Sequence, residues 1–298
     1  MDLTISIVSY NTKIKLQACL ESIFQYKGKK TFEVIVVDNA SEDGSIEMVK
    51  SFFPQTALIL NSANLFFSCA HNQAFKRAKG KYVLILNSDT LIKNNTFDEC
   101  LDYFENNSEA GALTCRTTNT DGSFQLNYSE DYRYKLALLN YTFLGKIFPK
   151  TKKTFNDEFT YFNDRGASIR EVCVAGDANL WIRKEIAEKT GYYDERFKLY
   201  YTENDICINV RKLGHKIYFI PSGSVVHHVR QSVEKAGLKK ISQIYYEDTI
   251  EYYKKYNGYF PALFLAVLIK ITNLLIKMQK LKNQNIFFTF LNHPNNIK

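Results

Sequence analysis

Two short apolar runs, each followed by an acidic residue, constrain the fold of this chain most strongly. Residues 34–37 read Val-Ile-Val-Val before Asp38, and residues 82–86 read Tyr-Val-Leu-Ile-Leu before an Asn-Ser pair and Asp89. Runs that are apolar on both faces and rich in β-branched residues are typical of strands buried in a parallel sheet. Open α/β sheets bind their ligands at the carboxyl ends of such strands. The sequence therefore predicts an α/β protein that uses a nucleotide.

The first half of the chain alternates between strand and helix patterns. Strands are predicted at 3–9, 32–38, 57–60 and 81–86, and helices at 14–26, 46–53, 68–78 and 96–106. Because these helices are long enough to connect neighbouring parallel strands, the alternation predicts right-handed βαβ units. We expect a Rossmann-like, mostly parallel central sheet that is flanked by helices.

The second half is less regular. Residues 121–170 are rich in Tyr, Phe, Lys and Asn with weak periodicity, so we expect a variable, partly mobile lobe that shapes an acceptor site. Regular patterns return after this lobe, with strands expected within 172–183, 216–221 and 224–229 and a helix at 241–256. A strongly apolar segment follows at 260–282. We expect a catalytic domain at 1–232 and a C-terminal helical extension at 233–298.

The composition suits a folded protein with an anionic partner. Of the 298 residues, 45% are hydrophobic and 23% are charged, which argues against wholesale disorder. The formal net charge of +8 suits nucleotide phosphates, a lipid-linked diphosphate or an acidic membrane surface, but a generally basic proteome would explain it equally well. Compact runs of Lys and Arg with interleaved aromatic residues are lacking, so nucleic acid is not an expected partner.

The six cysteines are widely spaced and form no zinc or CxxC pattern. Several lie in apolar stretches, where a free cysteine behaves as a small hydrophobic residue. This usage is typical of a reducing, cytoplasmic setting. The first residues lack the basic and long apolar regions of a signal peptide and are expected to begin the first strand.

Polar residues after the predicted strands are candidates for binding a nucleotide. Asp38 could accept the N–H of a pyrimidine ring, and Tyr10, after the first strand, offers a ring for stacking. Ser41 or Asp43 would instead cap the helix that follows. The Asn-Ser-Asp89 cluster offers oxygen ligands for Mg²⁺ or Mn²⁺ bridging a diphosphate, and the alternative is a capped turn.

Several segments in order resemble the family 2 glycosyltransferases, and most closely a bacterial rhamnosyltransferase-like branch. These segments are Val-Ser-Tyr-Asn at 8–11, Val-Asp-Asn-Ala-Ser-Glu-Asp-Gly-Ser at 37–45, Asn-Leu-Phe-Phe-Ser-Cys-Ala-His-Asn at 64–72, Leu-Asn-Ser-Asp-Thr at 86–90, Gly-Asp-Ala-Asn-Leu-Trp-Ile-Arg at 176–183 and Gly-Tyr-Tyr-Asp-Glu-Arg-Phe at 191–197. The resemblance covers residues 3–232. It implies a GT-A fold and transfer of a sugar from a nucleotide diphosphate with inversion.

The resemblance also implies roles for residues at matching positions. Donor-binding positions are Ser9, Tyr10, Asn11, Asp38, Asn64, Asn72 and Asn87. Asp89 would bind Mn²⁺ or Mg²⁺, and Asn87 occupies the place of a first Asp in many relatives. Gly176 and Asp177 fall on the acceptor side. Phe66 stands where the family usually has Gly.

Two further segments carry catalytic candidates. The stretch Tyr-Tyr-Thr-Glu-Asn-Asp at 200–205 resembles the acidic element that supplies the family's base. Its alignment favours Glu203 as the base that takes the acceptor proton, with Asp205 as the other candidate and the one more expected to have a structural role. Thr202 and Asp205 also nearly form a helix capping box. His227 precedes Ser232 by the family's five residues, so it is the expected second metal ligand, with His228 as the fallback.

The C-terminal segment suggests a place of action. Residues 260–282 are apolar, with lysines at 270, 277, 280 and 282, and fall short of a comfortable membrane span. An interfacial amphipathic helix fits better, and packing on the domain or in a homodimer is equally open. We expect a cytoplasmic enzyme, peripheral at the inner face of the plasma membrane, that assembles surface polysaccharide.

The expected donor is dTDP-rhamnose or a UDP-sugar, and the expected acceptor is a glycan or a lipid-linked glycan. A non-catalytic nucleotide- or glycan-binding homologue is the alternative. A dinucleotide oxidoreductase is disfavoured because no G-x-G-x-x-G follows the first strand.

Overall fold

The computed structural model describes residues 1–26, 28–93, 95–161, 166–228 and 238–282. The first half alternates strands and helices: β1 (Leu3–Ser9), α1 (Lys13–Phe24), β2 (Phe32–Asp38), α2 (Ser45–Phe52), β3 (Ala57–Leu60), α3 (Phe66–Phe75), β4 (Tyr82–Asn87), β5 (Thr90–Ile92), α4 (Thr96–Asn106) and β6 (Ala110–Thr118). The predicted strands 3–9, 32–38 and 57–60 and the predicted helix 96–106 have these bounds.

The second half adds short strands and most of the outer helices. Its elements are β7 (Phe124–Gln125), β8 (Tyr128–Ser129), α5 (Tyr134–Tyr141), α6 (Leu144–Ile147), α7 (Pro149–Phe159), β9 (Arg170–Glu171), β10 (Val174–Ala175), β11 (Asn179–Arg183), α8 (Lys184–Thr190), α9 (Thr202–Lys212), β12 (Lys216–His227), α11 (Leu238–Asn257) and α12 (Tyr259–Lys282).

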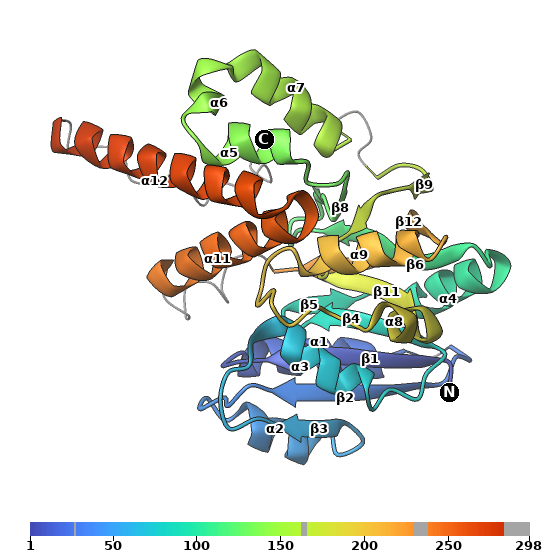
Figure 1. Cartoon of the computed structure of the whole chain (residues 1–298). Coiled ribbons are helices and arrows are strands. Elements are labelled where there is room, and N and C mark those ends of the chain that lie inside the picture. The colour runs from blue at the N-terminus through green and yellow to red at the C-terminus, as the bar shows by residue number, and fades with distance from the viewer. Residues whose placement is uncertain (27, 94, 162–165, 229–237, 283–298) are drawn as a thin grey trace.

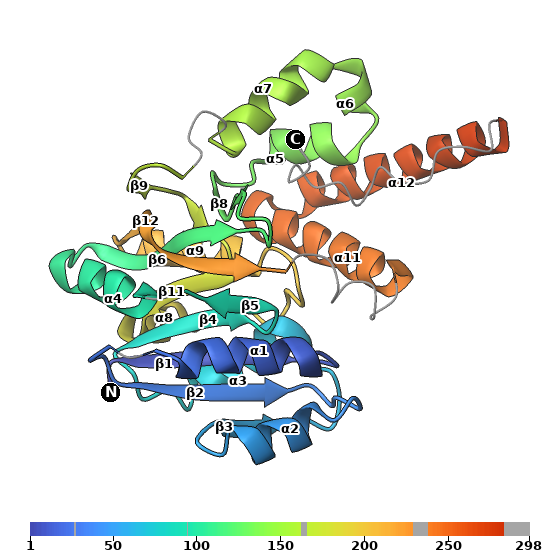
Figure 2. The ribbon, with the colours of Figure 1, turned by 180° about the vertical axis from the view of Figure 1, so that it is seen from behind.

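One central sheet has the strand order β3-β2-β1-β4-β11-β6-β12-β5. The four strands from β3 to β4 are parallel, β6 and β12 are also parallel, and β11 is antiparallel to both of its neighbours. Helices cover both faces of the sheet, and α5–α7, α11 and α12 project beyond it (Figures 1 and 2). The fold is the predicted mixed α/β arrangement with C-terminal helices.

The strands are apolar on both faces because each face is buried. Along β4, Leu84 and Leu86 belong to a core that includes residues of α1 and α4, whereas Val83 and Ile85 belong to a second core that includes residues of α9. Alternate residues of a strand point to opposite faces, so the unbroken apolar run at 82–86 supplies both cores.

Two expectations for the second half differ from the structure. The predicted strands at 216–221 and 224–229 are one strand, β12, which pairs with β6 on both sides of a register shift between Ile220 and Ser224. Pro221 lies in that interval, where its missing N–H breaks no ladder bond. The stretch 121–170, expected to be irregular, contains α5–α7, and its aromatic residues pack in a cluster with aromatic residues of α11 and of the loop before α9 and with aliphatic residues of α12. Their contacts are tertiary, so the sequence shows little periodicity.

Arg183, the last residue of β11, is buried and donates hydrogen bonds to three backbone carbonyl groups. Its Nε donates to Ala110 O at 2.7 Å, and its Nη2 donates to Phe104 O at 2.7 Å and Asn107 O at 3.0 Å. Arg183→Met would remove the side-chain donors to these three carbonyls, so we expect the unfolding free energy to fall by about 3 kcal/mol in urea titrations. The neighbouring Lys184→Met should change it by less than about 1 kcal/mol. Equal losses would contradict this role.

His71 on α3 is fully buried, and its Nδ1 lies 2.7 Å from Ser6 Oγ. Burial lowers the pKa of His71 to about 3. The native state therefore keeps a neutral ring while the unfolded chain binds a proton below about pH 6.5. The contribution of the neutral ring to the unfolding free energy is fully present above that pH. It is lost as the pH falls toward 3, by about 1.4 kcal/mol per pH unit.

This prediction is checked with His71→Gln. The unfolding free energy of the variant, measured by urea titration between pH 6 and pH 4, should fall less steeply than that of the wild type by about 1.4 kcal/mol per unit. An unchanged slope in His71→Gln would show that the buried neutral ring of His71 does not cause this loss of stability.

Candidate active site

The carboxyl ends of β1, β2 and β4 gather the first group of predicted site residues. Ser9 and Asp38 are register partners at the ends of β1 and β2, and the N–H of Asn39 donates to Ser9 O at 2.9 Å. Asn87 ends β4, directly before Ser88 and Asp89. These strands are parallel neighbours, so the sheet brings the residues to one edge, as expected from their positions in the sequence.

Asp38 is buried and has one carboxylate oxygen available for a ligand. Its Oδ1 accepts the N–H of Ser41 at 2.7 Å, whereas its Oδ2 has no hydrogen-bond partner within the described part of the chain. A buried oxygen without a donor is unfavourable, so a ligand N–H at this point would complete the site. Tyr10 at the neighbouring strand end is partly exposed, as stacking requires.

The loops after β1 and β2 are tied together by side chains. The backbone N–H of Asn11 donates to Ser41 Oγ at 2.9 Å. Asp43 accepts the N–H groups of Lys13 at 2.8 Å and Ser45 at 3.1 Å, which are the first residues of α1 and α2. Of the two proposed capping residues, Asp43 therefore contacts the start of α2, and Ser41 joins the two loops instead.

Buried hydroxyl groups connect these loops to the end of β4. Ser9 Oγ lies 3.1 Å from Thr12 Oγ1, and the Thr12 hydroxyl donates to Ser88 Oγ at 3.0 Å. Thr12 was not singled out from the sequence, because an isolated hydroxyl residue in a loop carries no distinguishing pattern, and Ser88 was considered only as part of the Asn-Ser-Asp cluster. They fix the spacing between the Asp38 region and Asp89.

Asp89 and His227 lie together, although 137 residues separate them in the sequence. Asp89 Oδ1 is 3.3 Å from His227 Nε2, and Asp89 Oδ2 is 3.7 Å from Lys15 Nζ. His227 Nδ1 is 2.9 Å from Gln125 Oε1, an acceptor, so Nδ1 carries a proton there. With a proton on Nε2 as well, the ring donates to Asp89, and a cation between the two atoms would take the place of that proton.

These two side chains fit a divalent cation that is shared with a ligand. Two ligands of one octahedral ion at about 2.1 Å lie about 3 Å apart, close to the Asp89–His227 separation. Among the described residues, no group of three or more His, Cys, Asp or Glu side chains could hold a metal ion. Mg²⁺ and its relatives are commonly held by one or two carboxylates together with substrate phosphates.

The carboxylate of Asp89 is kept ionised. Burial raises its pKa, but the hydrogen bond and charge of His227 and the charge of Lys15 outweigh burial and leave the pKa of Asp89 below its ordinary value. Lys15, on α1, was not predicted as a site residue. Ser232, the proposed partner of His227 in the family spacing, lies outside the described residues.

The acceptor-side residues adjoin this edge through the backbone. The N–H of Asn87 donates to Ala178 O at 3.3 Å, so the turn that contains Gly176 and Asp177 lies beside the end of β4. Tyr193 donates its hydroxyl proton to Asp177 Oδ1 at 2.6 Å. Asp177, placed on the acceptor side by the sequence, is thus next to the proposed metal-binding turn.

Asp177 and Glu203 share a hydroxyl group. Thr202 Oγ1 lies 2.5 Å from Asp177 Oδ2 and 3.1 Å from Glu203 Oε2. One hydroxyl has a single proton to donate, so both contacts are hydrogen bonds only when one carboxyl group is protonated. The two acids therefore form a coupled pair at the start of α9.

The electrostatic surroundings favour protonation in this pair. Burial raises the pKa of Asp177 well above its usual range, and the charge of Glu203 raises it further. Burial also raises the pKa of Glu203, with a contribution from Asp248 on α11. Buried acids with perturbed pKa values and a specific charged partner are candidates for proton transfer.

Asp248 holds the loop that leads to Glu203. Its carboxylate is buried and accepts the backbone N–H groups of Lys198, Leu199 and Tyr200 at 2.9–3.1 Å. The loop then enters α9 through Tyr201, whose φ is 61°. The expected capping box of Thr202 and Asp205 is not formed, because Thr202 contacts the acidic pair instead. No local sequence pattern pointed to Asp248.

Asp205 and Asn72 are engaged in structural contacts. Asp205 accepts hydrogen bonds from Lys255 Nζ and from Tyr256 Oη, both on α11, which agrees with the structural role expected for it. The side chain of Asn72 donates to Tyr193 O at 2.9 Å and accepts the N–H of Tyr193 at 3.0 Å. Asn72 therefore positions the turn at Tyr193, and the donor contact that the resemblance implies for it stays a prediction.

Phe66 begins α3 with a left-handed backbone. Its φ is 62°, and its N–H donates to Asn64 Oδ1 at 2.9 Å. This conformation favours glycine, which explains physically why a Gly suits this position in the motif that the segment resembles. Asn64 thus stabilises the loop through its side chain.

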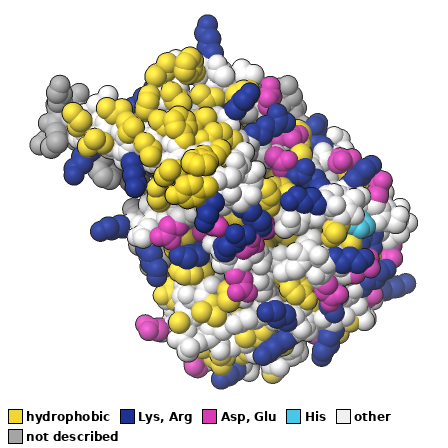
Figure 3. Space-filling model, in the orientation of Figure 1, with side chains coloured by type: hydrophobic (Ala, Val, Ile, Leu, Met, Phe, Trp, Pro, Cys, Tyr) yellow, Lys and Arg dark blue, Asp and Glu magenta, His cyan; other side chains and the backbone are white. Residues whose placement is uncertain are grey.

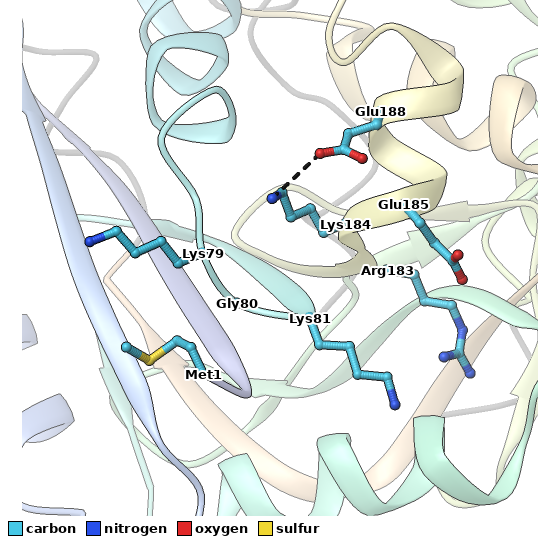
Figure 4. Close-up of a pocket in the computed structure, with 8 residues that line it drawn as sticks. All are labelled: Met1, Lys79, Gly80, Lys81, Arg183, Lys184, Glu185 and Glu188. Carbon is cyan, nitrogen blue, oxygen red and sulfur yellow. Dashed lines mark ion pairs between the residues drawn. The ribbon is translucent and has the colours of Figure 1, made fainter.

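A surface hollow of about 400 Å³ lies at the opposite edge of the sheet (Figure 4). It is lined by Met1, Lys79, Gly80, Lys81, Arg183, Lys184, Glu185 and Glu188. The Arg183 guanidinium is already bonded to carbonyls, and Lys184 pairs with Glu188 at 3.5 Å. None of the predicted site residues lines this hollow.

Known sequences resemble the chain over much of its length. N-acetylglucosaminyl-diphospho-decaprenol L-rhamnosyltransferase of Mycobacterium tuberculosis is 24% identical over 245 residues, 77% of each chain. An uncharacterized glycosyltransferase of Bacillus subtilis, YfnE, is 28% identical over 160 residues, 53% of this chain and 40% of that protein. This chain therefore covers less than half of YfnE.

Solved structures share the fold. The mannosyltransferase PcManGT from Pyrobaculum calidifontis, in complex with GDP-Man and Mn²⁺, has a TM-score of 0.57 at 16% identity, covering 95% of this chain and 76% of that one. Staphylococcus aureus TarS 1–349 in complex with UDP has a TM-score of 0.53 at 15% identity, covering 85% and 66%. These structural similarities show that the chain has a GT-A fold.

The family model for glycosyl transferase family 2 matches residues 4–191. The match includes the ends of β1, β2 and β4 and the turn at Asp177, and it covers more than half of the chain. The chain belongs to glycosyl transferase family 2.

Proposed function

We propose that this glycosyltransferase moves a sugar from a nucleoside-diphosphate donor, dTDP-rhamnose or a UDP-sugar, to a lipid-linked or glycan acceptor in surface polysaccharide assembly. The observation that supports the proposal is that the Asp89–His227 pair and the Asp177–Glu203 pair belong to neighbouring turns, because the N–H of Asn87 donates to Ala178 O at 3.3 Å. The resemblance to a rhamnosyltransferase whose name includes a lipid diphosphate supports this acceptor class.

Each end of the donor has a proposed binding region. Asp38 accepts a base N–H, and Tyr10 stacks on the ring. Asp89 and His227 hold Mn²⁺ or Mg²⁺, which when bound neutralises charge on the diphosphate leaving group. Asn87, 3.5 Å from His227 Nε2 through its amide nitrogen, lies beside this region. The bonds of Ser9 and Asn11 fix the loops around the base.

Glu203 supplies the proposed general base. It accepts the proton of the acceptor hydroxyl as that oxygen forms its bond to the anomeric carbon, and the bond from that carbon to the diphosphate oxygen breaks. Attack on the side opposite to the leaving group inverts the anomeric configuration. Thr202 and Asp177 orient the Glu203 carboxyl group, and Asp248 orients the loop before it. In this scheme Asp205 has no catalytic role.

The proposal is tested with a donor screen. Thermal shifts and donor hydrolysis are measured with UDP-, dTDP- and GDP-sugars, with and without Mn²⁺. We expect one nucleotide class to stabilise the protein only with the metal and to be hydrolysed slowly. Transfer to a polyprenyl-diphosphate glycan is then followed by mass spectrometry. A folded protein that responds to none of the donors would instead be a non-catalytic homologue.

The acceptor class suggests a place of action. A lipid-linked acceptor is presented at the membrane surface, and α12 is the proposed element for peripheral contact with it at the inner face of the plasma membrane. Tyr259–Gln279 is long and apolar enough to cross a membrane by length and composition, and 33% of its most apolar window is buried in the protein.

A further inference from the structure

The positive charge of the chain is concentrated in two segments. Residues 132–156 contain six Lys and Arg residues, residues 259–282 contain four, and neither segment contains an Asp or a Glu. The whole chain has 39 basic and 31 acidic residues, so without these two segments its formal charge would be −2. The net charge of +8 therefore arises from α5–α7 and α12 rather than from the donor site.

Helix α12 has two apolar faces. One face, which includes Leu265, Ile269 and Thr272, is buried against the domain. The other contains a row of exposed apolar residues from Phe260, whose side chain is 79% exposed, to Met278. At 100° per residue these exposed positions fall within an arc of about 120°, with the exposed lysines 270 and 277 at one border of the arc.

The lobe formed by α5–α7 places a second apolar group beside α12. The N–H of Phe143 donates to Thr272 Oγ1 at 2.9 Å, which fixes the start of α6 on α12. Ile147 and Phe148 follow at the junction of α6 and α7, 57% and 52% exposed, between the exposed Lys146 and Lys150. Figure 3 shows hydrophobic side chains gathered over this part of the molecule, with basic side chains around them.

We propose that the exposed face of α12 and the α6–α7 junction form one surface that binds an anionic phospholipid bilayer. Apolar side chains enter the interface while lysines contact lipid phosphates, the usual behaviour of a basic interfacial helix. The positive charge of both segments opposes docking of a second copy through the same surface. Because Leu265 and Thr272 are packed on the domain, α12 lies along the membrane rather than across it.

This orientation would bring the active site to a lipid-linked acceptor. Helix α11 connects the surface to the site, because Asp248 holds the loop before Glu203 and α12 follows α11 after a single residue. This consequence rests on the proposed acceptor class. Binding to vesicles does not depend on the acceptor class, so it is measured with the full chain in the absence of any donor.

The test is co-flotation with vesicles of neutral phosphatidylcholine or of phosphatidylcholine with about one third phosphatidylglycerol. The wild type should bind the anionic vesicles at least tenfold more tightly, and 1 M salt should release it. Ile147→Ser/Phe148→Ser should weaken binding about tenfold. The matched control, Phe52→Ser, removes a 68% exposed aromatic residue of α2 and should bind within twofold of wild type.

The contribution of the lysines beside the α6–α7 junction is tested with the same vesicles. Lys146→Glu/Lys150→Glu should weaken binding to anionic vesicles at least tenfold, whereas Lys29→Glu/Lys50→Glu, with the same change in net charge elsewhere, should have a smaller effect. The circular dichroism spectrum and the thermal midpoint should be unchanged in every variant, which confirms folding. Equal binding to both kinds of vesicle, wild-type binding by both α6–α7 variants, or a concentration-dependent dimer in place of vesicle binding would each overturn the proposal.

Discussion

Glu203→Gln is expected to lower the rate of sugar transfer about a thousandfold while leaving donor binding intact. Removal of a positioned general base typically costs a factor of 10²–10⁴, and the amide keeps the size of the side chain and its contact with Thr202 Oγ1, which is 3.1 Å in the wild type. The rate is measured as single-turnover transfer at saturating donor, and donor affinity is measured separately by titration.

The matched control is Glu185→Gln. Glu185 lies in the first turn of α8, as Glu203 lies in the first turn of α9, so both changes remove a negative charge near a helix N-terminus. The control should retain the wild-type rate. If Glu203→Gln transfers sugar within tenfold of the wild type, Glu203 is not the base.

The pH profile separates a base from a merely structural acid. Because burial raises the pKa of Glu203, the acidic limb of kcat/KM should lie above pH 4.5, the ordinary value for this group. Burial and the charge of Glu203 raise the pKa of Asp177 well above its usual range, so Asp177 is already neutral when Glu203 titrates. Asp177→Asn, which keeps a neutral side chain at this place, should therefore leave the limb in place. A limb that moves in Asp177→Asn would show that Asp177 is charged when Glu203 titrates.

Asp89→Asn is expected to weaken metal-dependent donor binding at least a hundredfold. The substitution removes the carboxylate charge that faces both His227 Nε2 and Lys15 Nζ, and hard divalent cations bind neutral amide oxygens much less tightly. The thermal shift produced by Mn²⁺ together with the donor nucleotide should disappear. Chelation of the metal in the wild type should give the same result.

Two variants control for the loss of an aspartate and for the proposed second ligand. Asp102 forms an exposed ion pair with Lys30, so Asp102→Asn should keep the full metal-dependent shift. His227→Gln should reduce the shift, since it removes the ring nitrogen that faces Asp89. A full Mn²⁺-dependent shift in Asp89→Asn would place the metal elsewhere.

The sheet edge could be predicted from local sequence because period and position suffice there. Unbroken apolar runs require strands buried on both faces, and residues that follow parallel strands meet at one edge. The positions of Asp38 and Asp89 at this edge were predicted in this way. The tie between Asp43 and the start of α2 was anticipated for the same reason, since turn and capping chemistry depends on nearby residues.

Tertiary structure decided what distant segments do together. The contact of Asp89 with His227, the hydroxyl shared by Asp177 and Glu203, and the loop held by Asp248 join residues tens of positions apart, and no local pattern encodes such distances. The helices of 121–170 were missed because their aromatic residues pack on α11 and α12, so the stabilising contacts lie outside the segment. Local periodicity determined the sheet and the edge where the candidate residues gather, whereas burial between distant elements decided which side chains meet there and which apolar face of α12 remains exposed.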